Sequence, residues 1–334
     1  MKYEHFIAEN VAPKNMRRIG VYNENGNRVG QIPLSSLAFP DVGAKLYSFG
    51  VLSDVHIGDN SSTRDFTNAL KYLTLETDFI CISGDLVHDG NNTSQWTEYK
   101  GLVDTHANVP VYACTGNHDG YNASLESIVY SYTGQPLYYS VTRANDVFVF
   151  VGCRGNAVGE LFTDAELTWL TETLEANKNK RVFIFQHVRP EDGCGNALGI
   201  YKYDCWGGSD QTTFENLLRT YPNVVFFHGH SHLRFSLQQH ADNANIDRLF
   251  GCWSIHVPSI TVPRGPKSSV DITRVELYAE SEGYVVDVYE NAIHLRGRDF
   301  AYNNYEGRFL PIASYWLDTT VQTIPAGTYN GPMP

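Results

Sequence analysis

The segment VVFFHGHSH, residues 224–232, places three histidines at the end of an apolar run. His228, His230 and His232 occupy every second position, and Gly229 lies between the first two. One histidine beside an apolar core is usually packed or hydrogen-bonded, but three at this density indicate a site that binds imidazole nitrogen. Imidazole is the commonest metal ligand in proteins, so the segment predicts a metal site just beyond a strand.

Other polar side chains with suitable chemistry follow further apolar segments of the chain. They are Asp54 and His56, then Asp85, then Asn117, His118 and Asp119, and finally His187. In open α/β sheets, ligands bind outside the carboxyl ends of the strands, so these side chains are expected at one edge of the sheet. Carboxylates neutralise charge and bridge ions, while imidazoles and a carboxamide complete each coordination shell. The combination suits a pair of metal ions.

The strands that must position these residues are short apolar segments, which alternate with helical patterns from residue 46 onward. The predicted strands are 45–53, 78–83, 109–115, 146–152, 181–187 and 223–228. The predicted helices are 63–76, 93–106, 163–177 and 210–221. Thr163 and Glu166 have the spacing of a capping box at the start of the third helix. This alternation predicts an α/β fold with a largely buried sheet and helices outside it.

Both ends of the chain depart from this alternation. Near the N-terminus, Asn25-Gly26 stands between alternating residues, which predicts a β-hairpin with a type I′ turn. Beyond residue 245 the chain is β-like, and the segments 274–278 and 284–290 have the pattern of antiparallel strands.

The residues at the strand ends match five motifs of the calcineurin-like metallophosphoesterase family, in the family's order. The motifs DxH, GD, GNH(D/E), H and GHxH correspond to Asp54-Val55-His56, Gly84-Asp85, Gly116-Asn117-His118-Asp119, His187 and Gly229-His230-Ser231-His232. One such motif is weak evidence, but all five are complete and each lies at a predicted strand end. The chain therefore resembles this family over residues 46–260.

The resemblance implies a set of ligands for two metal ions. Asp54, His56 and His232 would hold the first ion, Asn117, His187 and His230 would hold the second, and Asp85 would bridge both. His118 would stand beside the substrate, and Asp119 would orient His118. The two ions would be divalent manganese, iron, zinc or cobalt, because mixed imidazole and carboxylate ligation suits these metals better than calcium.

The resemblance also implies the fold and its division. The fold would be a four-layer α-β-β-α sandwich that forms the catalytic domain over residues 46–290. A short β-like N-terminal extension with the hairpin would cover residues 1–45. A C-terminal extension would cover residues 291–334, at the end of a β-rich C-terminal part.

Two histidines near the motifs have no ligand role in the family pattern. His228 either packs in the core or supports the ligands, and packing is the simpler interpretation. His88 stands three residues after Asp85, where the purple acid phosphatase branch has a tyrosine that binds ferric iron. The histidine argues against iron–tyrosinate chemistry. It either contacts the substrate or caps a turn.

A long loop over residues 188–208 follows the predicted ligand His187, and loops of this length are often functional. Its aromatic residues Tyr201, Tyr203 and Trp206 either contact a base or sugar of the substrate or pack the loop itself.

Composition and charge exclude several classes of protein. The 334 residues carry a net charge of −12 without a Lys/Arg-rich run, which argues against a duplex nucleic-acid partner. No signal peptide is visible, and no apolar run is long enough to span a bilayer, so a soluble, cytoplasmic protein without a membrane partner is expected. The six cysteines form no CxxC pair, and Cys194 and Cys205 either pair or stay reduced.

The predicted activity is hydrolysis of a small phosphate ester by a hydroxide that bridges the two ions. Phosphodiesters are favoured because the GNHD motif and the missing tyrosine resemble the class III cyclic-nucleotide and glycerophosphodiester branch. Phosphomonoester hydrolysis is the alternative within this class. A binding module is the alternative of another class, in which the two extensions join the chain to another copy or to a larger assembly.

Overall fold

The computed structural model describes much of the chain between residues 42 and 319. The described ranges are 42–121, 125–154, 161–189, 193–195, 209–235, 245–248, 251–266, 274–277, 279–301 and 308–319. Before residue 42, three strands are described by their backbone alone.

One large sheet has the strand order β17-β16-β15-β4-β5-β6 within the described residues. Its parallel part agrees with three predicted strands and consists of β4 (Lys45–Leu52), β5 (Phe79–Ser83) and β6 (Val111–Cys114). Antiparallel strands continue it beyond β4, namely β15 (Glu282–Tyr289), β16 (Ala292–Asp299) and β17 (Arg308–Asp318). The predicted boundary at residue 290 therefore falls between two neighbouring strands of this sheet.

The second large sheet has the order β11-β12-β10-β9-β8-β7 within the described residues. Three of its strands agree with predicted ones, namely β8 (Asp146–Val151), β9 (Val182–Phe185) and β10 (Val224–His228). β7 (Tyr138–Arg143) is not predicted, whereas β11 (Ile246–Asp247) and β12 (Trp253–His256) lie in the segment beyond residue 245 that is expected to be β-like. β12 pairs parallel with β10, which puts the residues that follow β12 beside the histidine-rich turn.

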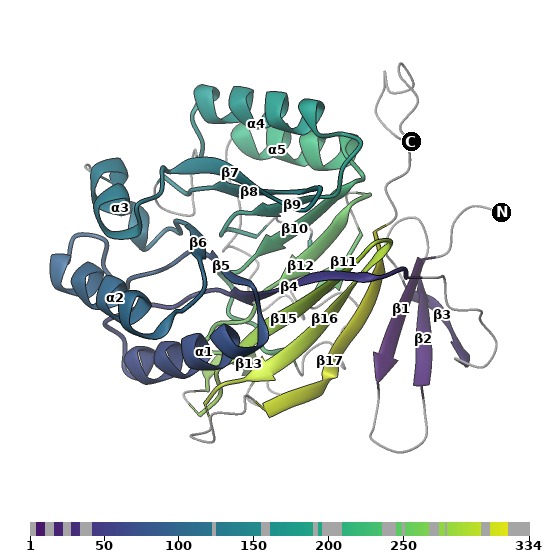
Figure 1. The fold of residues 1–334 in the computed structure, drawn as a ribbon, viewed down its shortest axis with the longest axis horizontal. Helices are drawn as coiled ribbons and strands as arrows, with labels where there is room; N and C mark the ends of the chain where they lie inside the picture. The colour runs from purple at the N-terminus through teal and green to yellow at the C-terminus, as the bar shows by residue number, and fades with distance from the viewer. Residues whose placement is uncertain are drawn as a thin grey trace.

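Helices cover the outer face of each large sheet (Figure 1). On the β4–β6 side lie α1 (Ser62–Glu76), α2 (Thr93–His106) and α3 (Leu125–Thr133), while α4 (Asp164–Ala176) and α5 (Ser209–Thr220) cover the β8–β10 side. The capping box predicted at the start of α4 is present, with reciprocal hydrogen bonds between Thr163 and Glu166. α3 is not predicted from the sequence.

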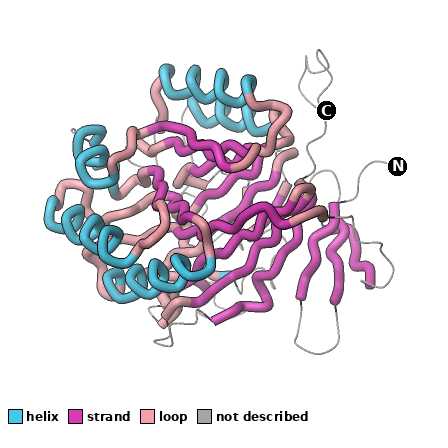
Figure 2. Tube along the Cα trace, viewed as in Figure 1, coloured by secondary structure: helices cyan, strands magenta, loops and turns pink. Residues whose placement is uncertain are grey.

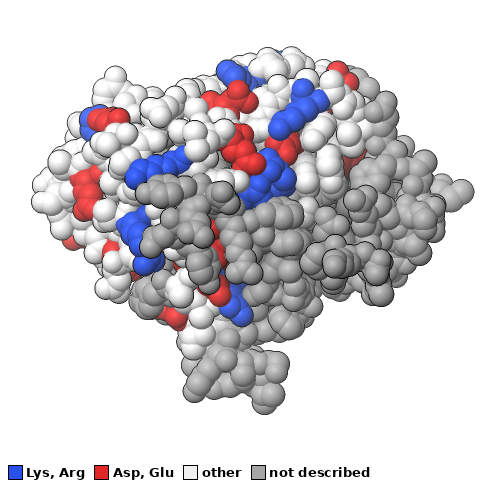
Figure 3. All heavy atoms as spheres, turned by 60° about the horizontal axis from the view of Figure 1, so that its bottom comes forward, with Lys and Arg blue, Asp and Glu red and all other residues white. Residues whose placement is uncertain are grey.

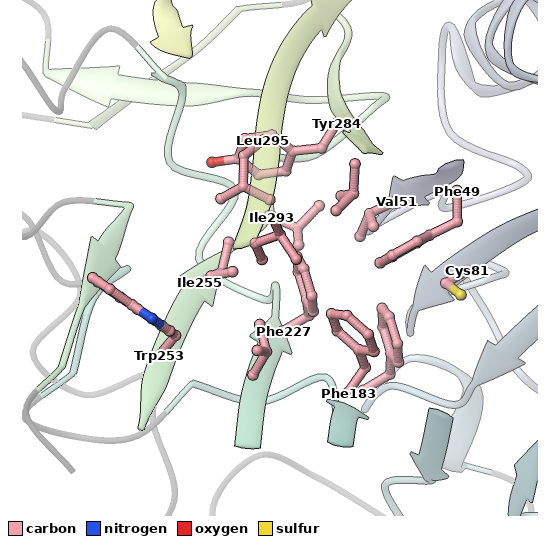
Figure 4. Packing of buried hydrophobic residues seen from close by; sticks show 14 of the residues in the cluster. Phe49, Val51, Cys81, Phe183, Phe227, Trp253, Ile255, Tyr284, Ile293 and Leu295 are labelled. Carbon is pink, nitrogen blue, oxygen red and sulfur yellow. The ribbon is translucent and has the colours of Figure 1, made fainter. Parts of the chain in front are cut away.

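The core between the two sheets consists of apolar side chains from both. Figure 4 shows Phe49, Val51 and Tyr284 of one sheet facing Phe183, Phe227 and Ile255 of the other. The rings of Phe49 and Phe183 meet edge to face with centroids 5.3 Å apart, a geometry that aromatic pairs prefer. Helices, two packed sheets and helices again make four layers, so the predicted α-β-β-α sandwich is confirmed.

A separate small sheet precedes the sandwich. It has the order β1-β2-β3, with β1 (His5–Asn10), β2 (Arg17–Tyr22) and β3 (Arg28–Pro33) paired antiparallel. β1 lies beside β17 of the sandwich, as the strands drawn in magenta in Figure 2 show. The turn predicted at Asn25-Gly26 lies outside the described residues.

The described surface carries charges of both signs. On the face in Figure 3, Lys and Arg side chains alternate with Asp and Glu side chains, without a continuous basic area among the described residues. Each helix in the described part of the chain is too short or too polar to cross a bilayer.

Candidate metal centre

The carboxyl ends of the parallel strands in both large sheets meet at one place, and the predicted ligands gather there. From the first sheet, Asp54 and His56 follow β4, Asp85 follows β5, and Asn117 and His118 follow β6. From the second sheet, His187 follows β9, and His230 and His232 follow β10. The sequence predicts one edge of a sheet, whereas the structure places the site where two sheets meet.

The first cluster joins four buried residues, Asp54, His56, Asp85 and His232. Their ligand atoms all lie within 4.8 Å of one another. His232 Nε2 lies 2.9 Å from Asp54 Oδ1 and 3.2 Å from His56 Nε2. His56 Nε2 lies 3.5 Å from Asp85 Oδ2. The structure thus brings together the three side chains expected at the first ion and the one expected to bridge.

The second cluster joins Asp85, His187 and His230, again with ligand atoms within 4.8 Å. His187 Nε2 lies 3.0 Å from Asp85 Oδ2, and the rings of His187 and His230 meet with centroids 5.3 Å apart. Asp85 belongs to both clusters, which is the position that a bridging carboxylate requires. Asn117, expected to complete this second set, is also buried on the turn after β6.

Several candidate ligands have buried polar atoms without a hydrogen bond. Among the described residues, neither Asn117 Oδ1 nor His230 Nε2 has a hydrogen-bond partner. A buried polar atom without a partner is costly, so the few that occur need an explanation. A transition-metal ion accepts amide oxygen and imidazole nitrogen as ligands, so these residues fit the expected ions.

The backbone at the site is strained. Five candidate ligands have a left-handed backbone conformation, with φ of 53° at Asp54, 48° at His56, 51° at Asp85, 71° at His230 and 59° at His232. Ala144 is the other non-glycine residue with positive φ among those described. This conformation costs roughly 1–2 kcal/mol per residue, and such strain concentrates at functional sites. The chain therefore holds these side chains in place through its own fold.

Backbone carbonyl groups fix which nitrogen of two histidines is available to an ion. His187 Nδ1 lies 2.7 Å from Ser83 O, and His232 Nδ1 lies 3.0 Å from Val262 O. A carbonyl oxygen only accepts, so each Nδ1 carries the hydrogen and donates. Each Nε2 is left as the coordinating atom, which is the usual arrangement of histidine ligands and their supports.

The charges at the site are strongly coupled. Burial raises the pKa of the Asp85 carboxyl, but the imidazoles of His187, His56 and His118 together outweigh burial and hold that pKa below its usual range. Burial lowers the pKa of His187, but Asp85 and Asp54 outweigh it and raise the pKa to about 9. Burial lowers the pKa of His230 to about 3. Metal-free protein therefore keeps a proton on His187, and a metal ion has to displace it.

His118 lies at the open side of the first cluster. Its ring lies 4.6 Å from that of His56 and 5.2 Å from that of His88, measured between centroids. Ligand atoms of these three histidines also lie within 4.8 Å of one another. His118 is partly exposed and His88 is exposed, so both imidazoles are accessible from solvent. The structure therefore brings His88 to the site.

Asp119 lies buried between the turns that follow β5 and β6. Its carboxylate accepts hydrogen bonds from the backbone N–H groups of Leu86, Val87 and Gly116, at 3.1, 3.0 and 2.8 Å. Burial, with Asp85 nearby, raises the pKa of Asp119 to about 7. The His88 carbonyl oxygen lies 2.7 Å from His118 Nδ1. Asp119 thus ties together the turns that follow β5 and β6.

Two motif glycines allow close packing around the carboxylates. A Cβ at Gly116 would lie 2.1 Å from Asp85 Oδ1, and one at Gly229 would lie 1.9 Å from Ser53 Oγ. Neither distance is sterically possible. The GNHD and GHSH motifs therefore need glycine for space at these positions.

His228 is packed beneath the ligand turn, in agreement with the simpler interpretation. It is fully buried, and its Nε2 lies 3.2 Å from Ser254 Oγ and 3.3 Å from Cys194 Sγ. Cys194 is a buried free thiol. Cys205 and the loop aromatics Tyr201, Tyr203 and Trp206 lie outside the described residues.

Sequence reasoning missed the segment 257–264, which follows β12 and contacts the first cluster through main-chain groups and two hydroxyls. It contains no motif, and the short apolar strand before it is the signal that could have drawn attention to it.

The fold and the site define a metallophosphoesterase, and comparison with known families agrees. The model of the calcineurin-like phosphoesterase family matches residues 47–234, which is more than half of the chain. The chain belongs to this family. Membership supports metal-dependent hydrolysis of phosphate esters in general.

The chain is also similar to solved structures at low sequence identity. A purple acid phosphatase, PPD1 from yellow lupin (Lupinus luteus) seeds, is 14% identical with a TM-score of 0.57, and the match covers 91% of this chain and 59% of that protein. GAP50, the anchor in the inner membrane complex of Plasmodium, is 13% identical with a TM-score of 0.49, over 82% of this chain and 89% of that one. At 14% identity, the likeness to the purple acid phosphatase concerns the fold alone. No curated protein matches the chain.

Proposed function

We propose that this protein hydrolyses phosphate esters at a centre of two divalent transition-metal ions and prefers phosphodiesters to monoesters. The observation that carries the proposal is the convergence of Asp54, His56, Asp85, His187, His230 and His232 into two clusters that share Asp85. Asn117 adds a buried amide oxygen without a hydrogen bond. Family membership supports the same reaction class.

The residues divide between the two ions as the clusters suggest. Asp54, His56 and His232 would hold the first ion, Asn117, His187 and His230 would hold the second, and Asp85 would lie between them. When bound, two such ions clamp a phosphate group and lower the pKa of coordinated water. Their charge exceeds that of the two carboxylates, so the centre attracts an anionic substrate despite the net charge of −12.

His118 is the proposed general acid. Its Nδ1 donates to the His88 carbonyl oxygen, so Nε2 is the nitrogen left to hold the transferable proton. A partly exposed imidazole at the open side of the first cluster can reach the leaving oxygen of a bound ester. Protonation of that oxygen lets the alcohol depart without a covalent enzyme intermediate.

The preference for diesters rests on two features of the motifs. The chain has the GNHD form of the third motif, and His88 replaces the tyrosine that marks the purple acid phosphatase branch. His88 is exposed beside His118, where it can contact a substituent of the phosphate. Among the described residues, the only hydrogen bonds of His88 are made by its backbone, which leaves the imidazole available.

The proposal is tested with p-nitrophenyl phosphate and bis(p-nitrophenyl) phosphate, measured side by side on manganese-loaded protein with an EDTA control. The proposal is supported if the diester is hydrolysed faster than the monoester and EDTA abolishes this activity. Faster hydrolysis of the monoester would make the protein a phosphatase. Absence of chelator-sensitive activity on both substrates would overturn the hydrolase assignment.

The second candidate function is assembly through the terminal extensions. The small β1-β2-β3 sheet lies outside the family match and beside β17, so it adds a surface that the family domain lacks. Size-exclusion chromatography with light scattering should show more chains per particle for the full chain than for a variant without residues 1–45. Monomers of both proteins would exclude this assembly role.

A further inference from the structure

The segment after β12 crosses from the second sheet to the ligand turn of the first. We call residues 257–264 the strap; it connects β12 to β13 (Arg264–Pro266). At its start, Val257 N donates to His228 O at 2.7 Å. In its middle, Ile260 N donates to Ser53 O at 3.2 Å, on the strand-end turn that carries Asp54. The strap therefore joins the loops that supply ligands from the two sheets.

Two hydroxyl groups of the strap hold the backbone of the DxH motif. Ser259 Oγ donates to Asp54 O at 3.0 Å, and Thr261 Oγ1 donates to Val55 O at 2.6 Å. Both Ser259 and Thr261 are fully buried. The motif residues Asp54 and His56 have positive φ, so these bonds secure a segment that would otherwise relax.

Ser259 also organises the strap itself. Its hydroxyl accepts hydrogen bonds from Thr261 N at 3.1 Å and Val262 N at 2.9 Å while it donates to Asp54 O. One hydroxyl thus links the turn of the strap to the carbonyl of a candidate ligand. Alanine at this position would leave one carbonyl and two N–H groups without their partner.

The strap holds His232, another ligand of the first cluster, from both sides. Val262 O lies 3.0 Å from His232 Nδ1, and Arg264 N donates to His232 O at 2.7 Å. The first contact fixes the ring of His232 with Nε2 available, and the second fixes its backbone, where φ is 59°. The placement of Val262 depends in turn on the Ser259 hydroxyl.

The second cluster has a different support. His187 donates to Ser83 O, which belongs to β5 rather than to the strap. Within the described residues, the strap makes no hydrogen bond to Asn117, His187 or His230. The contacts of the strap are therefore specific to the ligands of one ion.

We propose that Ser259 and Thr261 are positioning residues that set the affinity of the first ion site without contacting the ion. The inference rests on the proposed two-ion centre. Loss of a partner that orients a ligand typically lowers metal affinity roughly 10- to 100-fold. The effect should fall on the ion held by Asp54, His56 and His232 and leave the other site close to normal.

The experiment measures manganese binding to Ser259→Ala, Thr261→Val and Thr261→Ser by equilibrium dialysis with elemental analysis and by electron paramagnetic resonance. Wild-type protein should bind two ions with a spin-coupled signal. Ser259→Ala and Thr261→Val should lose roughly 10- to 100-fold in affinity at one site only and show an uncoupled signal at limiting manganese. Thr261→Ser keeps the hydroxyl and should restore coupled binding.

Ser48→Ala is the matched control, because Ser48 is a buried serine whose hydroxyl bonds Asp287, away from the site. It should lose stability but keep both ions. Equal weakening of both sites in Ser259→Ala, or two sites of unchanged affinity, overturns the strap inference alone. Wild-type protein that binds fewer than two ions overturns the proposed centre and the strap inference together.

Discussion

His118 Nδ1 lies 2.7 Å from the carbonyl oxygen of His88, and this contact sets the orientation of the histidine that the family pattern places beside the substrate. Because the carbonyl oxygen can only accept, Nδ1 carries a hydrogen in every protonation state of the ring. Nε2 is therefore the atom that gains or loses a proton during a reaction. A backbone group supplies this control, so a mutation of the His88 side chain would leave it in place.

His118→Ala should lower turnover roughly 10²- to 10⁴-fold while both ions stay bound, because the variant loses the proposed proton donor and keeps all ligands. The loss should be smallest for esters with good leaving groups, which need the least protonation. Steady-state rates on a series of aryl phosphodiesters, with metal content measured in parallel, check this. His106→Ala, at the end of α2, is the control. Equal losses across the series would contradict the general-acid role.

Asp119→Ala should destabilise the protein by at least about 2 kcal/mol, because three buried backbone N–H groups lose their acceptor. Asp119→Asn keeps one oxygen and should lose less. Urea unfolding of the three metal-free proteins measures the difference. If Asp119→Ala unfolded like wild type yet lost activity, the carboxylate would act on the substrate or on His118 rather than on the turns.

Gly116→Ala should abolish binding of the bridged pair of ions. A Cβ at residue 116 would lie 2.1 Å from Asp85 Oδ1 and would displace that carboxylate. Gly101→Ala in α2 is the matched control, since a Cβ at Gly101 meets no atom within 4 Å. That change should stabilise the helix by roughly 0.5–1 kcal/mol. Manganese stoichiometry and thermal unfolding of both variants test the contrast. Two bound ions in Gly116→Ala would show that Asp85 is not needed where the structure places it.

Removal of metal should lower the unfolding temperature, since ions that bind only the folded chain stabilise it by mass action. At a hundredfold excess over the Kd, each ion contributes roughly 2.7 kcal/mol. The loss is measured by thermal unfolding in EDTA. The recovery is measured in the same way after manganese is added back, and after calcium is added in its place. Calcium should give little recovery because it prefers an all-oxygen shell. Full recovery with calcium would contradict an imidazole-rich site.

Glu282 should give the protein a pH-dependent stability that is independent of metal. Burial raises its pKa to about 8 from 4.5, and its Oε2 accepts a hydrogen bond from Phe235 N at 2.8 Å. Between pH 4.5 and pH 8, the folded state therefore keeps a proton on Glu282 that the unfolded state has released. Stability is therefore complete below pH 4.5 and falls by roughly 1.4 kcal/mol per pH unit as the pH rises toward 8.

Glu282→Gln removes this proton and keeps the acceptor oxygen. The variant should be more stable than wild type at pH 8 and show a flatter pH profile in urea unfolding between pH 5 and pH 8. Parallel profiles for the two proteins would mean that Glu282 titrates normally in the fold.

The sequence predicts the candidate ligands well because each is a particular side-chain type at fixed spacing after an apolar strand. It predicts α4 for a similar reason, since the capping box of Thr163 and Glu166 is a local pattern. It does not predict α3, whose Ile128 and Val129 are β-branched and favour helix weakly. Nor does it predict the strap contact at Val262 or the carbonyl of His88, because a main-chain group carries no residue-specific signal.

The division of the ligands between two sheets has a consequence for when the chain can bind metal as it folds. Asp85 comes from one sheet and His187 from the other. Away from the site, the two sheets contact each other chiefly through apolar side chains. A bound ion would therefore act as a removable cross-link between the halves of the sandwich. It could be captured only after the halves have docked, so metal uptake would report completed folding, and a half-assembled chain would remain inert.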